Sequence, residues 1–319
     1  MAQDEHDEHE EHAETDDDGL VWHYTDAQGL LSILSSHTLW ATSSRFLNDA
    51  GEVELGWRAL HAELERRAAS DEFFAALLEH SDDAPEAFQQ QESSGGAGPS
   101  DGEFFVLSAT RHWDLLAVWR NYGGRGESYA IGLDPNAPLA AIADRRPSGS
   151  SPIRHLCWAP VRYTSQERQA LVDAVFDDLK DEIEWVRDEV AAGADRAEIE
   201  AGVATLLEDM EQALLLIKHE GFADERETRH SSIVLPGHPD MPPGLVRFRA
   251  TAYGLAPYLR LTGGTEAPVV TEPAPLPIRA LAISPSPYSR ASARTLRSAL
   301  HAHGYPSLPI HTSGIPFRE

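Results

Sequence analysis

The sequence lacks several features that would assign it to a secreted or membrane-anchored class. Cys157 is the single cysteine among 319 residues, so no internal disulfide can form. There is no run of about 18 apolar residues, the length needed to span a bilayer. The first residues also lack the basic-then-apolar pattern of a secretory signal. We therefore expect a cytoplasmic protein that does not interact with a membrane.

Basic residues are scarce as well. The chain has 26 Lys and Arg against 52 Asp and Glu, which gives a formal net charge of -26. Residues 1–18 contain ten of the acidic residues and no basic one; without them the net charge is still about -16. An acidic surface repels phosphate backbones. The composition therefore argues against a broad nucleic-acid-binding surface, while leaving room for a local basic pocket.

Familiar catalytic and metal-binding motifs are also absent. The sequence has no phosphate-binding loop, dinucleotide-binding glycine fingerprint, nucleophile elbow or paired-cysteine zinc spacing. The stretch "DEHDEHEEH" places His6, His9 and His12 three residues apart, but like charges and the lack of apolar residues are typical of a solvated tail. We interpret residues 1–18 as a disordered acidic tail and expect no specific metal site.

What the sequence does contain is enough apolar surface, 41% of residues, to build a sizeable core. Strand-like and helix-like stretches follow one another without the steady alternation of a doubly wound fold. We predict one α+β domain over residues 19–319, with a central, mostly antiparallel sheet and peripheral helices. The low-complexity stretch "QQQESSGGAGPSDG" predicts a flexible insertion near 89–102. Residues 165–219 show helical periodicity broken at "AAGAD", which predicts a long helical hairpin.

Four short segments concentrate polar and aromatic side chains. Each has a simpler structural interpretation: a histidine can be a hydrogen-bond partner, two aromatics three apart can form a core face, and alternating charges can pair at a sheet edge. The candidates are His23, Tyr24, Thr25, Arg45, Asn48, Asp49, Ser108, Arg111, Trp119, Arg120, Tyr122, His219, Phe222, Glu225, Glu227, Arg229 and Arg318.

Taken together, five stretches resemble a bacterial family known as domain of unknown function 2971. They occur in the same order from residue 20 to residue 318 and cover almost the whole predicted domain. They are "HYTDAQGLLSIL", "LWATSSRFLNDAGEVE", "VWRNYGGRGESYAIGL", "KHEGFADERETR" and "SGIPFR". The tail and the insertion lie outside this resemblance, and the family name implies no function.

A second resemblance does imply a function. The stretch "HYTDAQGLLSILSSHTLWAT" is similar to the opening of ADP-ribosyltransferase folds, in which a strand ends in His-x-Thr or His-x-Ser before a helix and a short strand. In that superfamily the histidine holds an NAD ribose, an aromatic residue packs on nicotinamide and a late glutamate assists nicotinamide departure. No strict motif marks the tyrosine here, and the glutamates follow a helical hairpin, so their alignment with the superfamily is open.

The resemblance assigns roles residue by residue. It implies NAD as a substrate, with His23, Glu225 and Glu227 as catalytic residues and His23 and Thr25 bonded to ribose or amide groups. Tyr122 or Tyr24 would stack on nicotinamide, and Arg45 or Arg111 would pair with the pyrophosphate. The implied NAD-binding set is His23, Tyr24, Thr25, Arg45, Asn48, Arg111, Trp119 and Tyr122.

The two glutamates are distinguished by their place in "FADERETRH". A strand there would put Glu225, Glu227 and Arg229 on one face. Glu227 lies closer to the apolar stretch "SSIVLP", so we expect it to be the more buried and the better aimed of the two. We expect Glu225 to orient a ligand hydroxyl or to pair with Arg229.

Other functions are compatible with the same residues. An ADP-ribosyltransferase would need an acceptor, which the sequence does not identify, or would only hydrolyse NAD; toxin and phage-defence roles are analogies. A non-catalytic ligand-binding or sensor module of the same fold is one alternative. The other is a metal-dependent hydrolase that uses carboxylates and imidazoles, drawn from His23, Asp49, His219, Glu225 and Glu227.

The composition of the tail generates a first prediction. Residues 1–18 have no apolar face to bury, so deleting them should leave the melting temperature within experimental error. Thermal unfolding of the full chain and the truncated chain, followed by circular dichroism, measures this. A fall of several degrees would mean that the tail packs on the domain.

Overall fold

The computed structural model describes most of the predicted domain. The described residues are 19–47, 52–81, 103–123, 126–192, 210, 212–235, 237–252, 254–264 and 266–316. The predicted tail, the predicted insertion and most of the predicted second hairpin arm lie outside them. None of the helices in these ranges is both long enough and apolar enough to cross a membrane.

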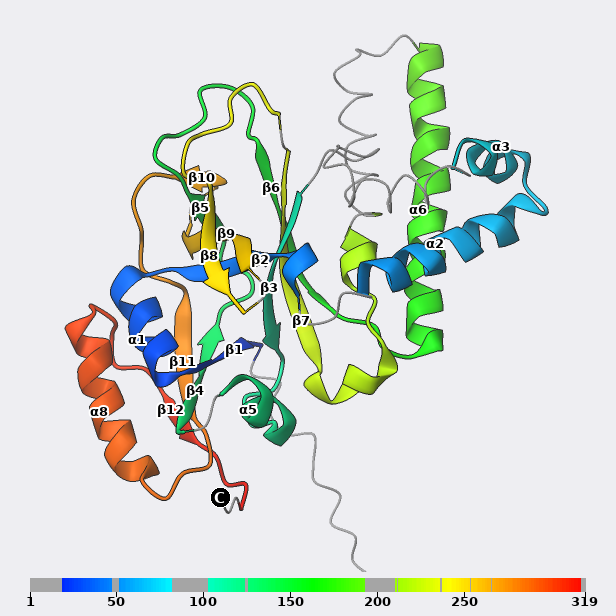
Figure 1. Cartoon of the computed structure of the whole chain (residues 1–319). Helices are drawn as coiled ribbons and strands as arrows, with labels where there is room; N and C mark the ends of the chain where they lie inside the picture. Colours follow the sequence, from blue (N-terminus) through cyan, green and yellow to red (C-terminus); the bar gives the residue numbers. More distant parts are fainter. Residues whose placement is uncertain are drawn as a thin grey trace, which may run out of the picture.

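The described strands join into one mixed, mostly antiparallel sheet, as the α+β prediction requires (Figure 1). Its order is β10-β5-β9-β2-β3-β1-β4-β11-β12, with β7 also on β3, β6 on β7 and β8 on β9. Among the described strands, only the pairs β10–β5 and β11–β12 are parallel. The strands are β1 Val21–Asp26, β2 Leu39–Ser43, β3 Glu103–Thr110, β4 Ser128–Leu133, β5 Leu139–Ile142, β6 Ile153–Pro160, β7 Glu227–Val234, β8 Val246–Thr251, β9 Gly254–Gly263, β10 Val269–Val270, β11 Ile278–Ile283 and β12 Ile310–Thr312.

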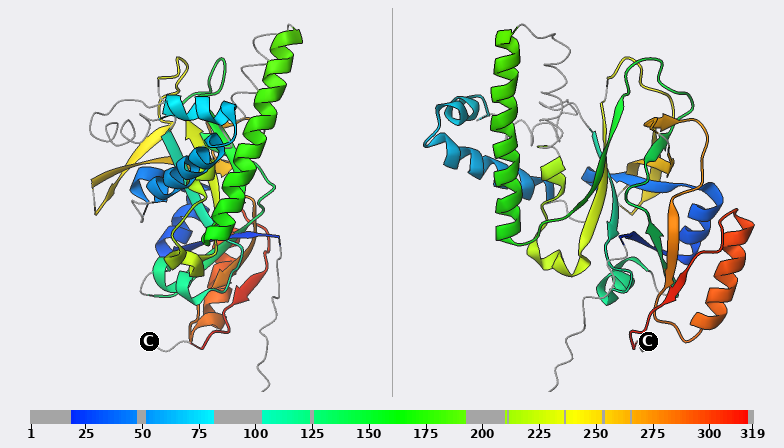
Figure 2. Two further views of the ribbon diagram at one scale, coloured as in Figure 1. Left: turned by 90° about the vertical axis from the view of Figure 1, so that its right-hand side faces the viewer. Right: turned by 180° about the vertical axis from the view of Figure 1, so that it is seen from behind.

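Apart from α5, the described α-helices form two groups on opposite sides of the sheet (Figures 1 and 2). One group, α2, α3 and α6, has its own hydrophobic cluster, which includes Leu60, Phe74 and Phe176. The other group, α1 and α8, packs against the main core of the sheet. The helices are α1 Ala27–Ser36, α2 Glu52–Ala68, α3 Glu72–Ser81, α5 Leu116–Tyr122, α6 Ser165–Ala192 and α8 Ser289–Ala302, with short 3-10 helices η1 Ser44–Phe46 and η2 Glu220–Glu225.

Helix α1 forms for the reasons visible in its sequence. The Asp26 carboxylate accepts a hydrogen bond from the Gly29 backbone N–H at 2.7 Å, which caps the helix start. Leu30, Ile33 and Leu34 recur at helical spacing and are all buried. This capped helix fixes the end of β1, the strand that carries His23.

The predicted helical hairpin is confirmed for its first arm, which is α6. The hairpin was predicted to extend to residue 219, and this is wrong for its last residues. Helical structure ends at Leu215, and Ile217 forms a parallel bridge with Arg162. The Lys218 N–H donates to the Arg162 carbonyl at 3.1 Å. Lys218 is therefore held in extended backbone at the side of the sheet.

Strand β3 has an edge that two strands share. Strand β2 pairs with its first half, through Phe105 and Val106. Strand β1 pairs with its end, through Thr110. Residues 107–109 lie between the two ladders, while their other edge pairs continuously with β7. The sheet therefore opens at the middle of β3, and polar groups of β1, β2, β3 and β7 converge there.

A close contact between α2 and the segment before Lys218 generates the second prediction. A Cβ on Gly56 would lie 2.8 Å from the Leu214 carbonyl oxygen, a backbone atom that cannot swing away. Gly56→Ala should therefore destabilise the protein by about 1–3 kcal/mol through overpacking. Urea unfolding measures the change.

Gly149→Ala is the control for this experiment, because a Cβ there meets nothing within 4 Å. It should leave the free energy of unfolding nearly unchanged. Equal stability of the two variants would mean that α2 is not seated against Leu214.

Candidate functional site

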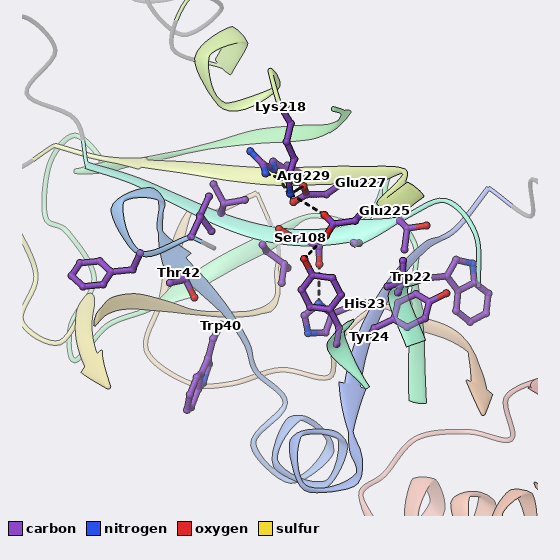
Figure 3. Close-up of a pocket in the computed structure, with 18 of the residues that line it drawn as sticks. Trp22, His23, Tyr24, Trp40, Thr42, Ser108, Lys218, Glu225, Glu227 and Arg229 are labelled. Atoms are coloured by element: carbon purple, nitrogen blue, oxygen red, sulfur yellow. Dashed lines mark hydrogen bonds and ion pairs between the residues drawn. The ribbon is translucent and has the colours of Figure 1, made fainter. Parts of the chain in front are cut away.

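A cavity of about 430 Å³ occupies the opening in the sheet (Figure 3). Its polar walls come from β1, β2, β3, β7, β8, α5 and the segment that leads into β7. The lining residues are Trp22, His23, Tyr24, Trp40, Thr42, Phe46, Leu47, Val106, Leu107, Ser108, Ala109, Thr110, Val118, Tyr122, Lys218, Glu225, Glu227, Arg229 and Arg249. A pocket of this size and mixed polarity suits a small ligand.

His23 is fixed at the centre of this opening by β3. Its Nδ1 lies 2.9 Å from the Ser108 carbonyl oxygen, which can only accept a hydrogen bond. Nδ1 therefore carries the ring proton and Nε2 is left as the acceptor. Burial lowers the pKa of His23, and the Ser108 carbonyl opposes this only in part. The imidazole is consequently neutral at pH 7.

An ion cluster forms the wall opposite Trp40, as Figure 3 shows. Glu227 and Arg229 alternate along β7, so their side chains share one face of the strand. The Arg229 guanidinium donates to both Glu227 carboxylate oxygens at 2.8 Å, and Lys218 Nζ donates to Glu227 Oε2 at 3.0 Å. All three residues are buried. Such a fork-to-fork pair is held firmly in one orientation.

The pKa of Glu227 reflects this pairing. Burial alone would raise it, but Arg229 and Lys218 outweigh burial and lower the pKa to about 2. Glu227 is therefore ionised at neutral pH. Its backbone N–H also donates to the Tyr163 hydroxyl at 2.8 Å. Both its backbone and its carboxylate are occupied by protein groups.

Glu225 lies in a different setting from the one predicted. Residues 220–225 form η2, and Arg226 has a positive φ of 45°, so the strand begins only at Glu227. The prediction that a strand puts Glu225 on one face with Glu227 and Arg229 is therefore wrong. The predicted alternative pairing with Arg229 is also wrong, because Arg229 binds Glu227.

The carboxylate of Glu225 has two partners at the cavity. The Tyr122 hydroxyl donates to Oε1 at 3.0 Å, and Lys218 Nζ donates to Oε2 at 2.8 Å. Burial and the neighbouring Glu225 charge raise the pKa of Tyr122 to about 12, so the phenol keeps its proton. Tyr122 is 39% exposed, which leaves its ring open to a ligand. Lys218 thus bridges the two glutamates.

Three other predicted site residues of β1 and α5 are also placed. Thr25 lines a second cavity of about 300 Å³, which shares His23 and Trp40 with the first. Tyr24 lines the main cavity, but its hydroxyl donates to the His112 carbonyl at 2.9 Å. Trp119 is buried, packs edge-on against Tyr24, and is not among the described lining residues. Trp119 therefore supports the site from the core.

The predicted pyrophosphate ligands are placed elsewhere. Arg45 and Arg111 are exposed, and neither belongs to the described lining of the cavity. Asn48 lies outside the described residues. Among the described residues, the cations that line the cavity are Lys218, Arg229 and Arg249.

Sequence reasoning missed four residues of this site. Lys218 belongs to the stretch "KHEGFADERETR", so its neighbourhood was visible although its role was not. Trp40 and Thr42 lie in "LWATS", directly after α1. Arg249 comes from β8, and no motif there could have identified it, because only the pairing of β8 with β9 brings it to the cavity.

Three members of the set predicted for a metal-dependent hydrolase, His23, Glu225 and Glu227, line the cavity but are not grouped around one point among the described residues. In the part of the chain that the structure describes, no group of three or more His, Cys, Asp or Glu side chains is placed to hold a metal ion. His219 is exposed, and its Nδ1 accepts from the Gly221 N–H at 3.0 Å as the cap of η2. Asp49 lies outside the described residues.

Comparison with known protein families gives a match over part of the chain. The family model described as "Protein of unknown function (DUF2971)" matches residues 118–230. This range holds Tyr122, Lys218, Glu225, Glu227 and Arg229, and it supports the resemblance there. Two of the five resembling stretches lie inside the range; the three around β1, β2 and the chain end lie outside it. No curated protein and no solved structure matches the chain.

The ion cluster generates the third prediction, a pH-dependent stability. Because the folded pKa of Glu227 is about 2 against an ordinary 4.5, its ionisation contributes stability that is fully present above pH 4.5 and lost as pH falls towards 2. Glu227→Gln should cost about 3–5 kcal/mol at pH 7 by leaving buried cations short of a partner. The difference in the free energy of unfolding between wild type and variant should become smaller as pH falls below 4.5.

Urea unfolding at several pH values between 7 and 3 measures that difference. Glu220→Gln is the control, because Glu220 is exposed in the same segment and should track wild type throughout. If the difference in free energy of unfolding between wild type and Glu227→Gln stayed constant with pH, the pairing of Glu227 with Arg229 and Lys218 would be contradicted.

Proposed function

We propose that the cavity binds NAD and that the protein cleaves the bond between nicotinamide and ribose, as an ADP-ribosyltransferase or NAD glycohydrolase. The observation that carries this proposal is the convergence of His23, Tyr122 and Glu225 on one cavity at the opening of the sheet. These residues come from three distant segments, in the order histidine, aromatic, glutamate that the ADP-ribosyltransferase resemblance implies. The family match is neutral on this point, since its description names no activity.

The chemistry requires a group that stabilises positive charge on the ribose. The bond from ribose C1′ to the nicotinamide nitrogen breaks, its electron pair leaves with nicotinamide, and an oxocarbenium-like state develops, as in glycoside cleavage. Water or an acceptor then adds to C1′ and loses a proton. A fixed carboxylate near the ribose lowers the barrier because its charge is already oriented.

We assign that role to Glu225 in preference to Glu227, which the sequence favoured. Both carboxylate oxygens of Glu227 are engaged by Arg229, and Lys218 adds a second cation. Its charge is largely neutralised by these partners. Among the described residues, Lys218 is the only cation bonded to Glu225. Glu225 also accepts a hydrogen bond from the hydroxyl of Tyr122, the ring that would stack on nicotinamide. Glu227 acts in this proposal by holding Lys218 and Arg229 in place.

The remaining contacts divide between the two ends of the dinucleotide. His23 Nε2 accepts a hydrogen bond from a ribose hydroxyl, and Tyr122 stacks on nicotinamide. Arg249 replaces Arg45 and Arg111 as the pyrophosphate ligand, because it lines the cavity. A cytoplasmic location, which the cysteine content favours, would supply NAD.

A second candidate is a binding module without catalysis. The observation that favours it is that the carboxylates of Glu225 and Glu227 are both bonded to Lys218, so neither is free of a cation. A ligand would then be held by His23, Tyr122 and Arg249 with no bond broken. Nicotinamide release separates the two candidates.

The fourth prediction tests the assignment of Glu225. Glu225→Gln keeps the size of the side chain but removes its charge, so nicotinamide release from NAD should fall roughly 100-fold or more. Binding of ADP-ribose, measured by calorimetry, should stay within a few-fold of wild type, because the binding contacts remain. Release is followed by chromatography of nicotinamide.

Glu220→Gln serves again as the matched control and should retain full activity. Release by Glu225→Gln at the wild-type rate would remove this residue from the mechanism. ADP-ribose or NAD binding without any release by wild type would favour the binding module. No binding of either ligand would refute the proposed function.

A further inference from the structure

Beside the cavity, one face of strands β2, β9 and β8 carries an unusual set of side chains. We call it the basic-aromatic face, and its members are Trp40, Thr42, Arg247, Arg249, Tyr258 and Arg260. It is notable because the chain has twice as many acidic as basic residues. Three arginines on one small face are therefore a local excess of positive charge in an acidic protein.

Strand register places these residues together. Thr42 is directly opposite Tyr258, and Tyr258 is directly opposite Arg247. Trp40 is directly opposite Arg260. Residues opposite each other in antiparallel strands share a face, as do alternate residues along one strand. The intervening residues, such as Ala41, Leu259 and Leu261, are buried in the main core.

Two of the three arginines of this face, Arg249 and Arg260, have no carboxylate partner among the described residues. The Arg249 guanidinium lies 5.9 Å from the Trp40 ring centroid and donates to Thr42 Oγ1 at 3.2 Å. Trp40 also packs against Tyr258, with ring centroids 4.5 Å apart, yet remains 45% exposed. The third arginine, Arg247, pairs with the Asp144 carboxylate at 2.9 Å.

Hydrogen-bond donors without a partner are a second feature of this face. The Nε atoms of Arg247, Arg249 and Arg260 are buried and find no hydrogen-bond acceptor among the described residues. Buried donors are normally paired. Three arginines of one face therefore have unused donors, and phosphate oxygens are acceptors of the charge and geometry that a guanidinium group binds.

We propose that the basic-aromatic face binds single-stranded nucleic acid, and that this strand is the acceptor of the proposed ADP-ribosyl transfer. Arginines that meet phosphates and aromatic rings that stack on bases are the two elements of single-strand recognition. Trp40, Thr42 and Arg249 also line the cavity, whereas Arg247, Tyr258 and Arg260 do not. The face therefore extends from the cavity outwards, where a second substrate would approach bound NAD.

This inference rests on the proposed function for its acceptor role, but binding can be tested without NAD. The acidity of the chain limits the face to a local footprint and predicts strong dependence on salt. A single strand is favoured over a duplex because stacking on Trp40 and Tyr258 needs unpaired bases.

The fifth prediction uses a fluorescein-labelled single-stranded DNA of about 12 nucleotides, within the range that such a site covers. Fluorescence anisotropy should show binding at low salt by wild type. Trp40→Ala should weaken it at least roughly fivefold through lost stacking. Arg260→Gln should weaken it and lower the slope of log Kobs against log salt by roughly 0.7, the value for one phosphate contact on a single strand.

Arg279→Gln is the matched control, since it removes one positive charge from β11, where Arg279 pairs with Asp134 at 3.0 Å. It should bind DNA like wild type, and circular dichroism confirms that each variant is folded. Absent binding, equal binding by all variants, or equally tight binding of duplex would overturn the inference. So would an Arg260→Gln variant that loses only ADP-ribose affinity, because the face would then belong to the dinucleotide site.

Binding of the strand without nicotinamide release would support the face and refute only the proposed chemistry. Release of nicotinamide without strand binding would support the proposed chemistry and refute the nucleic-acid-binding face. The two proposals can therefore fail separately.

Discussion

The shared edge of β3 is the constraint from which the rest of the site follows. Two strands pair with one edge of this strand, and neither reaches its middle. The opening would expose backbone polar groups, and such groups need partners. His23 supplies one by donating to the Ser108 carbonyl. At the break between the β1–β3 and β2–β3 ladders, side chains therefore supply hydrogen bonds that a neighbouring strand would otherwise make.

The other wall of the opening depends on a cluster of charges that must stay together. Glu227, Arg229 and Lys218 are all buried, and each alone would be costly to remove from water. Pairing offsets that cost, and a further bond from Arg229 to the Leu215 carbonyl at 2.6 Å ties the cluster to the segment beside α2. This arrangement fixes orientation more than it adds stability, because a buried ion pair roughly repays its own desolvation.

Sequence reasoning succeeded where the signal was local. The Asp26 cap and the apolar spacing of α1 are both written within one short stretch, and α6 follows from its periodicity. His23, Tyr122 and the two glutamates, which the sequence singled out from distant segments, line one cavity. Sequence reasoning failed at η2, where helical turns replaced an expected strand, because alternation over a few residues fits both a strand and an irregular entry to one.

Long-range pairing was the part that could not be read from one sequence. Arg249 reaches the cavity only because β8 pairs with β9 and β9 pairs with β2. Nothing near Arg249 in the chain distinguishes it from Arg111, which is exposed at the end of β3. The stretch around Lys218 was visible, but its role was not, because its position depends on long-range backbone pairing with Arg162.

The tautomer of His23 limits which chemical groups can meet it. A neutral ring whose one proton is committed to a main-chain oxygen has only a lone pair to offer at its far nitrogen. Hydroxyls and amides bring a hydrogen to such a nitrogen, whereas carbonyls, carboxylates and fully ionised phosphate esters bring another lone pair and are repelled. At this point of the cavity the protein therefore selects for a free sugar hydroxyl and against the same hydroxyl once it is phosphorylated.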